Sequence, residues 1–287
     1  MKLFQKVTVI GVGLLGASFA KACKGRGLVD QITGYGRNSE NLRKAKDLKI
    51  IDHYSGDLSE AVSDADLVLL CTPVSTIVPL IQRLVSQLAP GTIITDVGSV
   101  KESVVHRADK LIPEDIFFVG SHPIAGGENS GLESSTASLY QGAKCIVTPT
   151  EKTDKTALKK IYALWHALGM NVISLSAEEH DFIFGAVSHL PHIVAYALMN
   201  TLGDLKTPSN LEVTKFSGAG LRDITRIASS DPVMWRDICL SNRKHSLNLI
   251  NRFQNKLEEI RNTIERGDGQ ELEKEFMAAN KDRLNVI

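Results

Sequence analysis

The chain has 287 residues, enough for one or two domains but too few for a large multienzyme. Apolar residues make up 43% and charged residues 23%, which is the composition of a globular protein with a buried core. The 33 basic residues balance the 33 acidic ones, and this neutrality argues against a surface for nucleic acid or for an anionic membrane. The four cysteines have neither CxxC nor zinc-site spacing, so we expect a cytoplasmic protein without a disulfide scaffold or a metal.

The first 22 residues imitate a secretory signal peptide, because Lys2 and Lys6 precede the apolar run VTVIGVGLLGASFA. We interpret them instead as a buried strand, a glycine loop and a helix. The chain has no uninterrupted run of about 18 apolar residues, the length that spans a membrane. The nearest segment, residues 182–202, contains Ser188 and Pro191, and we interpret it as a buried helix.

The first 175 residues alternate β-branched runs with helical stretches, which is typical of βαβ units in a parallel sheet. The expected strands are Lys6–Ile10, Gln31–Tyr35, Leu67–Cys71, Thr92–Asp96, Ile116–Gly120, Lys144–Thr148 and Asn171–Leu175. The expected helices are Leu14–Lys24, Glu40–Asp47, Val74–Leu88, Lys101–Leu111 and Thr153–Leu168. Residues 1–175 are therefore predicted to form a Rossmann-type, doubly wound α/β domain that binds a dinucleotide.

Residues 176–287 are predicted to form an all-helical domain, because the strand signal stops after Ala177. The expected helices are Glu178–Leu202, Asp223–Ala228, Pro232–Glu265 and Gln270–Leu284. The first of them is apolar nearly all round, which indicates burial on every side, and so small a domain rarely encloses such a helix alone. We therefore expect dimerisation through this domain; the alternative is packing against the α/β domain.

The glycine pattern GVGLLG at positions 11–16 directly follows the first expected strand and opens a helix. In that context the first glycine makes the turn, the second lets a pyrophosphate approach, and the third allows close helix–strand packing. The free N–H groups of the helix N-terminus favour the phosphates. The predicted cofactor contacts in this loop are Gly11, Gly13, Leu14, Leu15 and Gly16.

The choice between NAD and NADP depends on the end of the second expected strand. Gly36 stands where an acid that binds the ribose 2′-OH of NAD is usual, and Arg37 follows it. An arginine without the acid favours NADP, with Asn38 and Ser39 as further phosphate contacts, although Arg37 could equally stack on adenine while NAD binds. We hypothesise use of both cofactors with a preference for NADP. Thr72, after another strand, is either a further cofactor contact or a helix cap.

Two neighbouring strand ends carry polar residues that a core does not need. Ser99 lies in the segment TDVGSVK, and His122 lies in GSHPIAGGE. A histidine there is a candidate general base, because its ordinary pKa of about 6.5 leaves it mostly neutral at pH 7. A buried structural histidine is the alternative for His122, and an N-cap is the alternative for Ser99.

The helical half holds two further polar motifs. In SHLPH, Pro191 distorts a helix and His189 is either a substrate contact or a core histidine. In GLRDITRIASSDP, Arg222 and Arg226 lie four residues apart on one helix face, and arginine suits bidentate binding of a carboxylate. Surface ion pairs are the alternative for both arginines. No third ligand has matching spacing, so we reject a metal site.

Taken in order, GVGLLGAS, DVGSVK, GSHPIAGGENSG, SHLPH and GLRDITRIASSDPVMWRDI make the chain resemble the prephenate dehydrogenase family, including its arogenate and cyclohexadienyl relatives. The resemblance covers about residues 5–285. It implies an oxidoreductase of tyrosine biosynthesis, one of the aromatic amino acid pathways, that removes hydride from its substrate to NAD(P)+ as CO₂ is lost. The chain ends shortly after the helices without a fused regulatory or chorismate mutase domain, so we expect no control through a separate domain.

The resemblance also implies residue roles. His122 accepts the proton of the substrate 4-hydroxyl, Ser99 hydrogen-bonds His122 beside the nicotinamide, His189 lines the substrate pocket and Arg226 binds a substrate carboxylate. The resemblance further implies that the helical domain forms a homodimer. From their opposite charges we expect that Arg222 and Glu128 pair at the mouth of the crevice.

Two other classes of protein fit the architecture. A β-hydroxyacid-type dehydrogenase would be expected to use a lysine from the first helix of the second domain, where this chain has histidines and no lysine before Lys206. A nucleotide-sensing regulator would have no need of His122, Ser99 and Arg226 together. Prephenate and arogenate differ only in keto versus amino at the side chain, so arogenate dehydrogenase stays an alternative.

Overall fold

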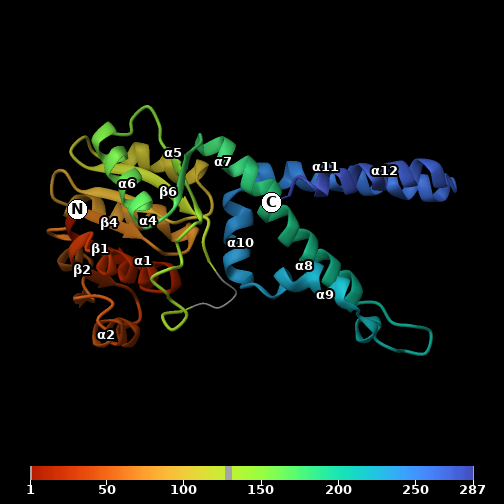
Figure 1. The fold of residues 1–287 in the computed structure, drawn as a ribbon, viewed down its shortest axis with the longest axis horizontal. Coiled ribbons are helices and arrows are strands. Elements are labelled where there is room, and N and C mark those ends of the chain that lie inside the picture. Colours follow the sequence, from red (N-terminus) through yellow and green to blue (C-terminus); the bar gives the residue numbers. More distant parts are fainter. Residues whose placement is uncertain (1, 127–130, 287) are drawn as a thin grey trace. The chain divides into compact units, whose positions relative to one another are not determined.

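The computed structural model describes residues 2–126 and 131–286, which form two compact units that divide between Asn242 and Arg243. The larger unit contains a β-sheet, the helices on both of its faces and a helical part that ends in α10 (Pro232–Ser241) (Figure 1). The smaller unit is a pair of helices. The predicted domain boundary near residue 175 falls inside the larger unit and stays a prediction.

The sheet has eight strands in the order β3-β2-β1-β4-β5-β6-β7-β8, and every neighbouring pair is parallel except β6–β7. The strands are β1 Phe4–Ile10, β2 Val29–Tyr35, β3 His53–Ser55, β4 Leu67–Leu70, β5 Ile93–Asp96, β6 Phe117–Pro123, β7 Lys144–Thr148 and β8 Asn171–Ser174. The predicted doubly wound, mainly parallel fold is confirmed. Strand β3 was not predicted, because its three residues are too few for a periodic signal and are ordered by pairing with β2.

Helices cover both faces of the sheet because the side chains of its central strands alternate between two apolar cores. Val9 and Leu69 face one core, whereas Ile10 and Leu70 face the other. Strand order reverses between β1 and β4, and at such a switch point open α/β sheets bind ligands beyond the carboxyl ends of their strands. The helices that flank the sheet are α1 Leu14–Gly25, α2 Ser39–Asp47, α3 Leu58–Val62, α4 Val74–Leu84, α5 Glu102–Leu111 and α6 Lys155–Ala167, with the short 3₁₀ turn η1 Val85–Gln87 after α4.

The helical part of the larger unit begins at α7 (Ala177–Phe184), where Ser176 and Glu179 form a reciprocal capping box. The segment predicted as one helix over 178–202 is α7, a five-residue π-helical stretch and α8. Pro191 falls in the first turn of α8, where its missing N–H costs little. The remaining elements are η2 (the π-helix) Gly185–His189, α8 Leu190–Gly203, η3 Val213–Phe216, α9 Ala219–Thr225 and η4 Arg226–Ser229.

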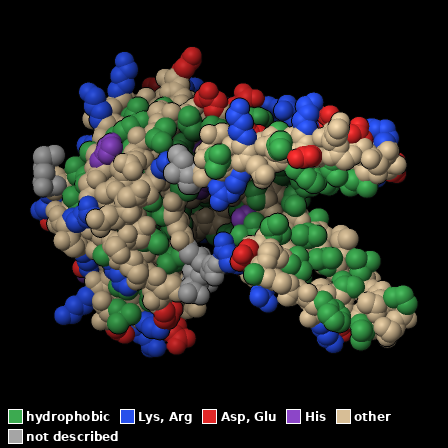
Figure 2. Space-filling model, turned by 45° about the vertical axis from the view of Figure 1, so that its right-hand side comes forward, with side chains coloured by type: hydrophobic (Ala, Val, Ile, Leu, Met, Phe, Trp, Pro, Cys, Tyr) green, Lys and Arg blue, Asp and Glu red, His purple; other side chains and the backbone are tan. Residues whose placement is uncertain are grey.

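The expected burial of the apolar helix at 182–202 is wrong for the single chain. Of the residues of α8 only Ala195 is buried, while Phe182 is 43% and Val187 is 67% exposed. Hydrophobic side chains gather on the projecting helical part in Figure 2. The run Ala177–Gly203 has the length and hydropathy of a membrane span, a test that helices of soluble proteins also pass, and 17% of its most apolar window is buried. Apolar side chains of α7 and η2 are therefore exposed, while most of those of α8 are half-buried.

The smaller unit is a helical hairpin of α11 (Arg243–Glu265) and α12 (Gly269–Arg283). Lys256 of α11 lies 2.9 Å from Glu275 of α12, and Asp268 caps α12 through the N–H of Glu271. The prediction of one helix over 232–265 is wrong, because the chain breaks between α10 and α11. The break falls at Asn242, whose backbone leaves the helical region and whose side chain donates to the backbone oxygen of Asp181.

Candidate active site

The glycine loop between β1 and α1 has the geometry of a dinucleotide cradle. Gly11 has φ +97°, and a Cβ there would lie 2.4 Å from the carbonyl oxygen of Cys71. A Cβ on Gly16 would lie 2.1 Å from the carbonyl oxygen of Gly11, so only glycine lets α1 approach the strand. A Cβ on Gly13 would meet no atom within 4 Å among the described residues, which leaves room for a phosphate beside the first turn of α1.

A pocket of about 490 Å³ opens at the carboxyl ends of β1, β2 and β4, at the switch point of the sheet. Gly11, Gly13, Arg37 and Thr72 line it, as the sequence predicts for cofactor contacts. Leu14, Leu15, Gly16 and Ser99 are not among its lining residues; Leu14 and Leu15 form the start of α1. The loop and the pocket therefore fit a nucleotide cofactor.

The end of β2 carries a positive rather than a negative side chain toward this pocket. Gly36 and Arg37 line it, and so does Arg83 from α4, which the sequence analysis did not single out. The expected phosphate contact of Asn38 has another use, because its side-chain oxygen accepts the N–H of Asn41 and caps α2. The two arginines are therefore the charged groups available near a ribose here.

A buried ion pair fixes the carboxyl end of β5 next to the candidate base. The Asp96 carboxylate accepts a hydrogen bond from the Lys101 ammonium group, and both side chains are 0% exposed. Asp96 also accepts the N–H groups of Gly98 and Ser121, while Lys101 donates to the carbonyl oxygen of Ser121 at 3.0 Å. Because Ser121 directly precedes His122, the pair sets the position of the histidine backbone.

His122 lies at the carboxyl end of β6 and belongs to a chain of three side chains. Its Nδ1 is 2.8 Å from Nε2 of His180 in α7, and Nδ1 of His180 is 2.7 Å from Oδ1 of Asp181. Asp181 in turn accepts the N–H groups of Lys101 and Glu102 at 2.7 and 2.9 Å, so it caps the start of α5. His122 is thus tied to a helix terminus through two buried groups.

Ser99 is half-buried in the loop that leads to α5. Among the described residues no hydrogen bond joins it to His122, whose Nδ1 pairs with His180 instead. The role that the family resemblance implies for Ser99 therefore stays a prediction.

The site histidines are held neutral at pH 7. Burial lowers the pKa of His122 well below its ordinary value, and the charges of His180, Lys101 and His189 lower it further. Burial also lowers the pKa of His180, although the hydrogen bond to Asp181 opposes that change. A neutral imidazole can accept a proton, which a general base requires.

The SHLPH motif places its two histidines in different surroundings. His189 is 1% exposed, its Nδ1 is 3.0 Å from Nδ2 of Asn242, and burial lowers its pKa to about 4. His192 stacks on Trp235 at 3.6 Å between ring centroids, and its pKa is lowered by burial and by the nearby Arg226. The π-helix that ends at His189 is a distortion that often marks functional sites.

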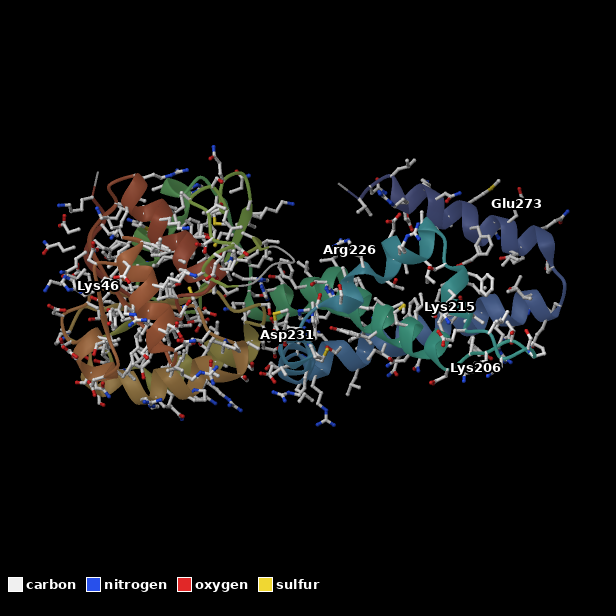
Figure 3. All side chains as sticks on the ribbon, turned by 90° about the horizontal axis from the view of Figure 1, so that it is seen from below. Lys46, Lys206, Lys215, Arg226, Asp231 and Glu273 are labelled. Atoms are coloured by element: carbon white, nitrogen blue, oxygen red, sulfur yellow. The ribbon has the colours of Figure 1, made fainter. Side chains whose placement is uncertain are left out.

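The predicted substrate-binding charges come from α9 and its continuation. Arg226 starts η4 directly after α9, and both it and Arg222 are exposed. In Figure 3, Arg226 and Asp231 lie nearer to the sheet than Lys206 and Lys215 do.

Glu128, expected to pair with Arg222, lies outside the described residues.

Several buried residues around the site were not predicted from the sequence: the polar residues Asp96, Lys101, His180, Asp181 and Asn242, and the aromatic Trp235. Of these residues, Lys101 was the easiest to infer from the sequence. It follows Asp96 by five residues in DVGSVK, at the end of a buried strand, so its side chain can turn back and pair with that carboxylate. His180 and Asp181 read as surface residues at a helix start, and only the fold shows that they are buried. The Nε1 of Trp235 is buried without a hydrogen-bond partner in the described part of the chain, so it is free to donate to a ligand.

Comparison with known proteins identifies the class. Residues 19–174 match the model of the prephenate dehydrogenase nucleotide-binding domain, and residues 176–278 match the prephenate dehydrogenase dimerization domain. The chain therefore belongs to the prephenate dehydrogenase family.

Individual relatives are similar to this chain over nearly its whole length. Cyclohexadienyl dehydrogenase of Zymomonas mobilis is 34% identical over 99% of this chain and 97% of its own length. Prephenate dehydrogenase of Bacillus subtilis is 35% identical over 95% of this chain and 74% of its own. The crystal structure of A. aeolicus prephenate dehydrogenase with hydroxyphenyl propionate and NAD+ has a TM-score of 0.93 at 40% identity, covering 99% and 98% of the two chains. These matches favour the family over the β-hydroxyacid-type alternative and over a non-catalytic regulator.

Proposed function

We propose that this protein is an NAD(P)-dependent dehydrogenase that converts prephenate to 4-hydroxyphenylpyruvate and CO₂ in tyrosine biosynthesis. The observation that carries the proposal is membership of the prephenate dehydrogenase family along both halves of the chain. The geometry supports it, because a neutral histidine lies at a strand end of a sheet that also bears the glycine cradle.

The chemistry needs a hydride acceptor and a base. When bound, the nicotinamide of NAD(P)+ accepts the hydride from C4 of the substrate. His122 takes the proton of the 4-hydroxyl, so that the C4–O bond becomes a carbonyl as the hydride leaves. Loss of CO₂ then makes the ring aromatic, and the phenolate oxygen recovers the proton from His122. Aromatisation drives the second step, so the protein's tasks are positioning and charge stabilisation.

The substrate carries two carboxylates, and we propose Arg226 as the anchor for one of them. Its charge acts on His192, which stacks on Trp235 and donates from Nδ1 to the Ser188 carbonyl oxygen. The guanidinium of Arg226 is therefore the charged donor that this surface offers to an anion. His189 and Ser99 remain predicted contacts, with His189 buried against Asn242 behind this surface. Arg222, on the preceding turn, remains a predicted second charge toward the substrate.

For the cofactor we propose use of both NAD+ and NADP+ with a preference for NADP+. The support is the absence of an acid at Gly36 and the presence of Arg37 and Arg83 on the pocket wall, since arginine binds phosphate well. Replacing Arg37 by alanine should lower kcat/KM for NADP+ more than for NAD+. A wild-type protein with a large preference for NAD+ would remove this proposal.

We propose that the protein is a homodimer that pairs through its helical part, and that it works in the cytoplasm. The support for the dimer is the match to the dimerization-domain model and the exposed apolar side chains of α7 and η2, which are Phe182, Ile183 and Val187. Analytical ultracentrifugation tests it directly. A monomer at micromolar concentration would refute it.

The deciding experiment is the absorbance at 340 nm when the purified protein is mixed with prephenate or arogenate and with NAD+ or NADP+. Rapid growth with prephenate is the expected result. Growth with arogenate alone would make the protein an arogenate dehydrogenase that yields tyrosine directly. A flat trace in all four mixtures, from folded protein that binds NAD(P)H, would refute the proposed function.

A further inference from the structure

We propose that Asp181 and His180 form a relay that holds His122 in its Nδ1–H tautomer, so that Nε2 is the nitrogen that receives the substrate proton. The inference rests on the proposed function, which gives His122 its role, and it adds two positioning residues to the site. It follows from the direction of each hydrogen bond in the chain of three side chains.

The direction is set at Asp181, which can only accept. Its Oδ1 and Oδ2 face the backbone N–H groups of Lys101 and Glu102 at 2.7 and 2.9 Å, and a backbone N–H is always a donor. Both oxygens therefore act as acceptors, and the carboxylate is fixed at the positive end of α5. Oδ1 also lies 2.7 Å from Nδ1 of His180, so that nitrogen carries the proton.

The proton on Nδ1 of His180 also determines the direction of its hydrogen bond to His122. A neutral His180 protonated on Nδ1 has a lone pair on Nε2, and this nitrogen lies 2.8 Å from Nδ1 of His122. His180 is 0% exposed, which disfavours the doubly protonated ring. His122 must therefore donate from Nδ1, and its Nε2 keeps the lone pair. Among the described residues Nε2 of His122 has no hydrogen-bond partner, as a base awaiting its substrate requires.

The relay also stabilises the charge that forms during turnover. When Nε2 of His122 gains a proton, the ring becomes a cation whose Nδ1–H points at His180, and the Asp181 carboxylate lies at the far end. The other ionisable groups around the histidines are Lys101 at the start of α5, Asp96 at the end of β5 and His189 in η2. Lys101 is already paired with Asp96, so Asp181 is the anion in line with the developing charge.

The test uses His180→Phe, which keeps a ring of similar size against Phe184 but has no acceptor for His122. His180→Gln is the rescue variant, because its side-chain oxygen can accept from Nδ1 of His122. His106→Gln on the exposed side of α5 is the matched control. Protein labelled with ¹⁵N in histidine reports the tautomer of each ring by NMR, and the His122→Asn variant identifies the signals of His122.

We expect the Nδ1–H form of His122 in the wild type and in His180→Gln, and the Nε2–H form in His180→Phe. The Phe variant should lose about 10²–10⁴-fold in kcat, the range for loss of a general base, while its affinity for NAD(P)H stays unchanged. The control should match the wild type in all three measurements.

An Nε2–H tautomer of His122 in the wild type would overturn the relay, and so would a folded His180→Phe variant with normal kcat. The NMR result does not depend on turnover. A protein inactive on both substrates but with Nδ1–H at His122 would therefore refute the proposed function while leaving the relay standing.

Discussion

Replacing Lys101 by methionine should destabilise the protein far more than the same change at a partly exposed lysine. Lys101 and Asp96 are both 0% exposed, so Lys101→Met leaves the Asp96 carboxylate buried with two backbone N–H donors and no counter-charge. Breaking a buried pair from one side costs about 3–5 kcal/mol. At about 2–4 °C per kcal/mol for a domain of this size, the midpoint of thermal unfolding should fall by roughly 6–20 °C.

Lys24→Met is the matched control, because Lys24 pairs with Asp52 at 2.6 Å while their side chains are 27% and 34% exposed. A pair open to water contributes about 0–1 kcal/mol. The assay is thermal unfolding followed by near-ultraviolet circular dichroism, with all variants at one protein concentration because a dimer's midpoint depends on it.

Asp96→Asn and the double variant Lys101→Met/Asp96→Asn complete a double-mutant cycle, which measures the coupling between the two charges. Removing both charges should cost less than the sum of the single changes, with a coupling of about 0.5–3 kcal/mol. Additive losses, or a Lys101→Met variant no less stable than Lys24→Met, would show that the buried charges are not coupled and refute the reasoning.

Three further outcomes are expected. Gly16→Ala puts a methyl group 2.1 Å from a backbone oxygen of the glycine loop and should abolish NAD(P)H binding by fluorescence titration, whereas Gly25→Ala, with open space around it, should bind normally. His122→Asn should lower kcat by about 10²–10⁴-fold, and Arg226→Ala should mainly raise KM, so normal kinetics in either variant would remove that assignment. The pKa of His189 is about 4 in the folded protein. The unfolded chain, with a pKa near 6.5, binds more protons below that pH, so about 3 kcal/mol of stability should be lost between pH 6.5 and 4. In His189→Asn the free energy of unfolding, measured with denaturant at a series of pH values, should change less between pH 6.5 and 4 than in the wild type. The same pH dependence in both proteins would contradict this expectation.

The sequence by itself determined the class of fold and the location of the cofactor loop. Strand alternation, helix spacing and GVGLLG are local patterns, and each depends on residues within about 20 positions of one another. The order of five motifs also determined the family, because such motifs retain their spacing when much of the remaining sequence changes. The same motifs contain His122 and Arg226, whose roles in the reaction stay predictions.

Tertiary structure alone decided how the site histidines are connected. His180 lies 58 residues from His122, and Asp181 lies about 80 residues from the helix start that it caps, so no local pattern links them. It also decided that α8 is mostly half-buried, since apolar composition predicts burial but not which surface provides it. Burial and hydrogen-bond direction depend on neighbours that are distant in sequence, and at this site those neighbours decide which nitrogen of His122 is hydrogen-bonded to His180.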